Sequence, residues 1–84
     1  MNSLKFDREL DARGLESPMP VVKAREVVST MSRGQVLKVT ATDDHSVHDF
    51  QGWTRSDKEI DLVATGAECN GSGRTVFVLY VEVK

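Results

Sequence analysis

The sequence is poor in cysteine, proline and aromatic residues, and its charge is slightly acidic rather than basic. Cys69 is the only cysteine among 84 residues, so no intrachain disulfide can form, and aromatic residues make up 6% of the chain. A net charge of −2 provides no basic field for nucleic acid. We therefore expect no direct nucleic-acid partner.

Long apolar runs are also missing. None approaches the roughly 20 apolar residues that a membrane-spanning helix needs, and the first residues do not combine a basic and an apolar segment into a signal peptide. These absences favour a cytoplasmic protein with no membrane partner. At this length the chain can build one core, so residues 1–84 are expected to form a single domain.

Six segments carry a regular apolar pattern. Alternation or β-branched runs predict strands over 4–10, 36–40, 60–64 and 76–83, whereas helical spacing predicts helices over 18–31 and after Asp43 and Asp44, through Thr54. The stretch from Gly66 to Gly73 predicts a turn-rich connection. The order βαβαββ predicts an α+β fold. It would be a two-layer α/β sandwich with a four-stranded mixed sheet and both helices on one face.

Residues 10–20, Leu-Asp-Ala-Arg-Gly-Leu-Glu-Ser-Pro-Met-Pro, form the segment most informative about function. Asp11 and Gly14 are typical of a turn, Ser17 is a good N-cap, and Pro18 suits the first helical position. A cysteine at residue 17 would lie at a helix N-terminus, where free N–H groups and the helix dipole stabilise a thiolate. A serine there only caps the helix.

This segment resembles the signature of the TusA sulfur-carrier proteins, also called SirA-like, which reads Leu-Asp-x-x-Gly-Leu-x-Cys-Pro-x-Pro. Gly34 and the acidic pair Asp43-Asp44 also resemble the family pattern. The resemblance implies a βαβαββ sandwich without a cofactor. Its motif cysteine would accept sulfane sulfur from a cysteine desulfurase or rhodanese-type donor, hold it as a persulfide and pass it to an acceptor protein. The implied pathway stays open between tRNA thiolation, molybdenum-cofactor supply and sulfur oxidation.

The sequence departs from the signature at the residue that carries the chemistry, because Ser17 occupies the position of the cysteine. A serine hydroxyl cannot form a persulfide, so the chain as written would be an inactive carrier. Two explanations stay open. A deliberate Cys-to-Ser substitution is favoured because Gly14, Pro18 and Pro20, which would shape the site, are all present. Natural loss of the thiol would instead make the chain a non-catalytic interaction or regulatory module.

Basic and flexible side chains around the first predicted helix are candidates for partner binding. We assign Arg13, Met19, Lys23 and Arg25 to a surface that docks donor and acceptor proteins, with Arg33 nearby. A solvated helix face explains the same charges equally well.

Three other candidates have simpler explanations. Cys69 is expected to be a structural or incidental cysteine rather than an alternative sulfur acceptor, since free cysteines are usually buried small hydrophobic residues. His45 and His48, flanked by aspartates, are assigned to a capped helix start rather than to a metal site. Ser17 is not expected to belong to a hydrolase triad, because the sequence has no Gly-x-Ser-x-Gly elbow.

Overall fold

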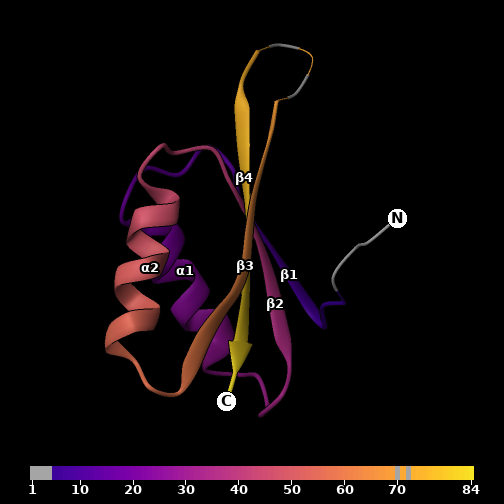
Figure 1. The fold of residues 1–84 in the computed structure, drawn as a ribbon, viewed down its shortest axis with the longest axis vertical. Coiled ribbons are helices and arrows are strands. Elements are labelled where there is room, and N and C mark those ends of the chain that lie inside the picture. The colour runs from indigo at the N-terminus through magenta and orange to yellow at the C-terminus, as the bar shows by residue number, and fades with distance from the viewer. Residues whose placement is uncertain (1–4, 70, 72) are drawn as a thin grey trace.

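The computed structural model describes residues 5–69, 71 and 73–84. Its strands are β1 (Arg8–Ala12), β2 (Val36–Ala41), β3 (Ile60–Cys69) and β4 (Thr75–Val83), and its helices are α1 (Met19–Val28) and α2 (Ser46–Ser56). Figure 1 shows both helices on the same side of the sheet. The predicted two-layer α/β sandwich of order βαβαββ is therefore confirmed.

The strands lie in the order β1-β2-β4-β3, which makes the sheet mixed. β1 runs parallel to β2, with Ala12 opposite Ala41, whereas β4 runs antiparallel to both of its neighbours. Parallel neighbours need a crossover connection, and α1 provides it between β1 and β2. The inner position of β2 agrees with its β-branched, largely buried sequence.

The core lies between the helices and the face of the sheet that they cover. Alternate residues of β2 and β4 point into it, and Phe50 of α2 is fully buried against them. The Trp53 ring meets Phe50 edge-on, with ring centroids 5.8 Å apart. The buried apolar set is Ala12, Val21, Ala24, Leu37, Val39, Ala41, Phe50, Ile60, Leu79 and Val81.

The first strand was predicted too early in the chain. The predicted range was 4–10, but β1 runs from Arg8 to Ala12, and residue 4 lies outside the described residues. Phe6 is 41% exposed, and the Lys38 ammonium lies over its ring, with Nζ 5.1 Å from the ring centroid. Phe6 therefore makes a surface contact rather than contributing to a core face.

The ends of two other elements also differ from the prediction. α1 stops at Val28 rather than near residue 31, and the Ser29 and Thr30 hydroxyls donate to carbonyls of its last turn. β3 continues to Cys69, so Gly66 lies within a strand rather than in the predicted turn. Pairing with β4 through Cys69 and Thr75 holds this extension in place. The resulting hairpin projects beyond the helices (Figure 1).

We expect Phe50→Ala to lower the free energy of unfolding by about 3–5 kcal/mol, because it leaves a cavity in a fully buried part of the core. Phe6→Ala is the matched control: it removes the same ring from an exposed position and should cost no more than about 1 kcal/mol. Urea unfolding of both variants measures the difference. Equal losses would show that the assigned core is wrong.

Candidate functional site

The loop between β1 and α1 is held against the end of β2. Gly14 has a φ of +84°, a conformation that favours glycine, and its N–H donates to Thr42 Oγ1 at 2.9 Å. The N–H of Leu15 donates to the Ala12 carbonyl at 3.3 Å. Gly14 thus lets the chain turn tightly out of β1, and this turn directs Ser17 toward the start of α2.

Ser17 does not cap α1, contrary to the expectation from sequence. The N-cap is Pro18, Met19 is the first helical residue, and no side chain makes a capping hydrogen bond. The Ser17–Pro18 peptide bond is cis. The Ser17 hydroxyl is unavailable for capping because it donates to Asp49 Oδ2 on α2.

Two aspartates from another part of the chain hold Ser17. Its backbone N–H donates to Asp43 Oδ2 at 3.1 Å, and its hydroxyl donates to the Asp49 carboxylate. Asp43 precedes α2 and Asp49 lies in its first turn, so both carboxylates come from the start of α2. Ser17, Asp43 and Asp49 are all partly buried. The candidate site is therefore a polar junction between the loop before α1 and the start of α2.

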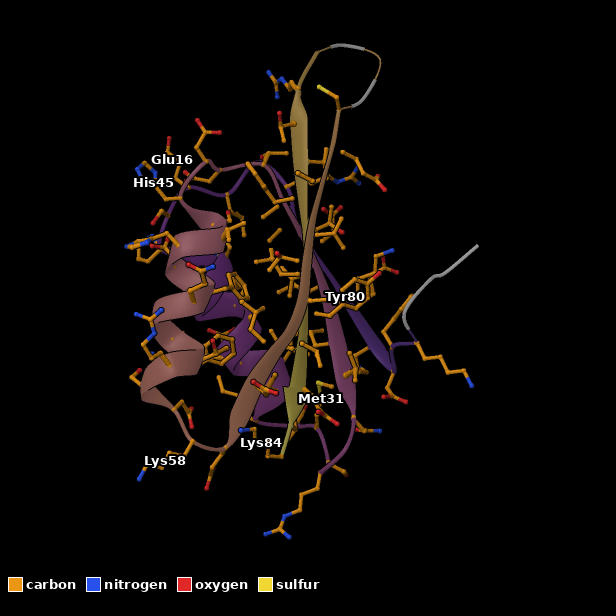
Figure 2. All side chains as sticks on the ribbon, viewed as in Figure 1. Glu16, Met31, His45, Lys58, Tyr80 and Lys84 are labelled. Carbon is orange, nitrogen blue, oxygen red and sulfur yellow. The ribbon has the colours of Figure 1, made fainter. Side chains whose placement is uncertain are left out.

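Asp43 also organises the start of α2. Its Oδ1 accepts hydrogen bonds from the His45 N–H at 2.8 Å and from His45 Nδ1 at 3.2 Å. The pKa of Asp43 lies below its usual value. The hydrogen bond from the His45 N–H lowers it most, and the hydrogen bond from the Ser17 N–H lowers it next. The residue at the N-cap of α2 is His45, and no side chain makes a capping hydrogen bond there, so the capped start expected from sequence is not found in this described segment. Figure 2 shows Glu16 and His45 at this corner.

The first turn of α1 offers fewer backbone donors than the sequence suggested. Pro18 and Pro20 have no N–H, and the Met19 N–H already donates to the Glu16 carbonyl at 2.8 Å. The next donor, the Val21 N–H, bonds the Pro18 carbonyl at 3.1 Å. Within this described segment, the free N–H groups expected to stabilise a thiolate at residue 17 are therefore missing.

The candidate partner-binding residues do not form one surface. Met19, Lys23 and Arg25 are exposed on α1, and the Met19 side chain, 39% exposed, is two residues from Ser17. Arg13 instead forms an ion pair with Asp11 at 2.9 Å. Hydrogen bonds from the Arg13 side chain lower the pKa of Asp11 to about 2.

Arg13 lies beside a groove on the face of the sheet that the helices leave open. The groove has a volume of about 560 Å³, and Lys38, Tyr80 and the hairpin of β3 and β4 form most of its lining. Figure 2 shows Tyr80 on the side of the sheet away from the helices. The groove does not include Ser17.

Cys69 lies apart from this junction, whereas His45 belongs to it through its hydrogen bonds to Asp43. Cys69 ends β3 and is exposed, so it is not the buried cysteine that is usual for an unpaired thiol. The reason is that its end of the hairpin extends past the helices that would cover it. In the described part of the chain, no three His, Cys, Asp or Glu side chains are grouped so that they could hold a metal ion. No helix in that part is long and apolar enough to cross a membrane.

These features define a class of small two-layer sandwich that presents a partly exposed polar side chain at the loop entering its first helix. The family model described as sulfurtransferase TusA matches residues 8–76, and the chain belongs to this family.

Two known proteins illustrate the likeness. The sulfur carrier protein TusA of Allochromatium vinosum is 50% identical over 50 residues, which are 60% of this chain and 66% of that relative, just under two thirds of its length. The crystal structure of a SirA-like protein from Desulfitobacterium hafniense has a TM-score of 0.61 and 19% identity. That match covers 88% of this chain and 96% of the other, and it supports the fold.

We expect Asp43→Asn to make stability less sensitive to acid. Because the pKa of Asp43 is lower in the folded state, the ionised carboxylate stabilises the fold. This stabilisation is fully present above the unfolded-state pKa of about 3.9, and it is lost as the pH falls through the folded-state pKa. Urea unfolding between about pH 6 and about pH 2.5 should therefore show a shallower decline in the variant. Asp44→Asn, at an exposed neighbour, should keep the original slope. An unchanged slope in Asp43→Asn would contradict the assignment.

Proposed function

We propose that this chain is a cytoplasmic TusA-family protein that binds sulfur-donor and sulfur-acceptor proteins around residue 17 but, with a serine there, does not carry sulfur. The observation that supports this most directly is the defined polar setting of Ser17. The residue is partly exposed, and polar contacts fix both its backbone and its side chain. The family match covers this entire segment.

The chemistry of a carrier explains why the substitution matters. A thiolate at residue 17 would attack the outer sulfur of a donor persulfide, forming a new S–S bond while the donor cysteine leaves as its own thiolate. Passing the sulfur on repeats the exchange with an acceptor cysteine. An oxygen atom at residue 17 cannot take part in this exchange. The chain would therefore retain the binding surface and lack the transfer step.

The exposed side of α1 has properties that suit transient binding. Met19, Lys23 and Arg25 are exposed on α1, whose first residue, Met19, follows Ser17 by two positions, whereas Pro20 and Val21 face the core. A flexible thioether adapts to different partners, and exposed cations speed association with acidic surfaces without making dissociation slow. A carrier that must meet two partners in turn needs both properties.

Ser17 itself favours a second candidate, a non-catalytic interaction module of the same fold. Its hydroxyl has a defined partner in Asp49, so serine fits this position without leaving a polar group unsatisfied. Such a module would bind the same surface partners and regulate them rather than exchange sulfur. The two candidates differ in what happens when a thiol is restored.

The proposed function predicts that Ser17→Cys creates a sulfur carrier. After incubation with a cysteine desulfurase and cysteine, mass spectrometry should find an added sulfur atom on residue 17, whereas the unchanged chain should gain none there. Cys69→Ser should be combined with the substitution, so that the introduced thiol is the single cysteine. No added sulfur on residue 17, although the variant is folded and binds the desulfurase, would favour the interaction module.

A second prediction from the proposed function concerns the binding surface. Lys23→Glu should weaken binding to the desulfurase by about twofold to fivefold, because an exposed ion pair contributes up to about 1 kcal/mol. Lys58→Glu makes the same charge change at an exposed lysine, which Figure 2 shows at the opposite end of the helices from Glu16. It should leave binding unchanged. Titrations at low and high salt measure both, and equal effects of the two variants would place the partner elsewhere.

A further inference from the structure

The surroundings of residue 17 accept hydrogen bonds from it rather than donate to it. Its N–H and its hydroxyl both donate to carboxylates, those of Asp43 and Asp49. An ionised carboxylate can only accept, so the side chain at residue 17 must carry a proton to make the second bond. A hydroxyl or a thiol satisfies this requirement, whereas a thiolate has no proton to donate.

The other charged groups at this corner do not reverse that preference. Glu16 belongs to the same loop and is exposed, and the His45 ring contacts Asp43 rather than Ser17. Asp43 and Asp49 are the acidic groups that touch residue 17 directly. The first turn of α1 follows residue 17 with two prolines, which have no N–H, and with the N–H groups of Met19 and Val21, which already donate to carbonyls.

We propose that Asp49 is a positioning residue that keeps the group at residue 17 protonated and aimed at α2 until a partner protein binds. Asp49, 32 positions further along the chain, accepts a direct hydrogen bond from the side chain at residue 17. Its negative charge disfavours a second negative charge on that side chain. The proposal rests on the proposed function for the choice of residue 17 as the site and for the docking of a partner there.

The consequence for a sulfur carrier is a resting thiol of low reactivity. A helix N-terminus alone would favour the thiolate, but here the nearest backbone donors are absent or occupied and a carboxylate is in contact. Deprotonation then requires that a proton passes to Asp49 or that a docked partner neutralises it. An unloaded carrier built in this way would be protected from oxidation, because the thiolate is the form that oxidants attack.

Alkylation kinetics test this inference without any partner protein. In a chain carrying Ser17→Cys and Cys69→Ser, the rate of reaction with iodoacetamide as a function of pH gives the pKa of the single thiol. We expect a pKa above the ordinary value of about 8.5. Adding Asp49→Asn should lower it and raise the alkylation rate at pH 7 by about tenfold, which corresponds to about one pKa unit.

Asp44→Asn in the same background is the matched control, since it removes an exposed aspartate of the same segment and should leave the profile unchanged. Equal effects of Asp49→Asn and Asp44→Asn would overturn the proposal. So would a thiol pKa at or below about 8.5 while Asp49 is present, a result that does not depend on whether Asp49→Asn folds. Because the assay contains no sulfur donor, its outcome is independent of whether the chain binds sulfur-transfer proteins.

Discussion

The contact between the loop before α1 and the start of α2 is the interaction on which the candidate site depends. Asp43 and Asp49 reach Ser17 from 26 and 32 positions away, and together they fix its backbone and its side chain. The helices that carry these segments lie side by side on the sheet (Figure 1). Packing of the two helices therefore determines the polar surroundings of residue 17.

This arrangement shows that a helix N-terminus is not by itself a site that stabilises an anion. The dipole effect depends on free N–H groups in the first turn. Here two prolines remove donors, and the Met19 N–H is already bonded. What residue 17 meets instead is the side chain of Asp49. In this loop, side chains from elsewhere in the fold, rather than free backbone N–H groups of the first turn, make the polar contacts to residue 17.

Much of the fold could be predicted from periodicity and turn residues. The segments over α1, β2, α2 and β4 have patterns that match their burial, because a helix or strand packed on one side repeats its apolar residues at a fixed interval. The pattern was misleading near Phe6, where an exposed ring contacts Lys38. It was also incomplete for β3, whose last residues are exposed and are ordered by pairing with β4.

The sequence alone determined the order of elements, the family signature and the absence of a thiol at residue 17, because each of these depends on residue type and spacing along the chain. The tertiary structure decided what surrounds that residue. Residue type and position near the start of α2 do not distinguish Asp49 from Asp44 as the partner of Ser17. That choice follows from the way α2 packs beside α1, and a contact between segments so far apart in the chain is set by packing rather than by local pattern.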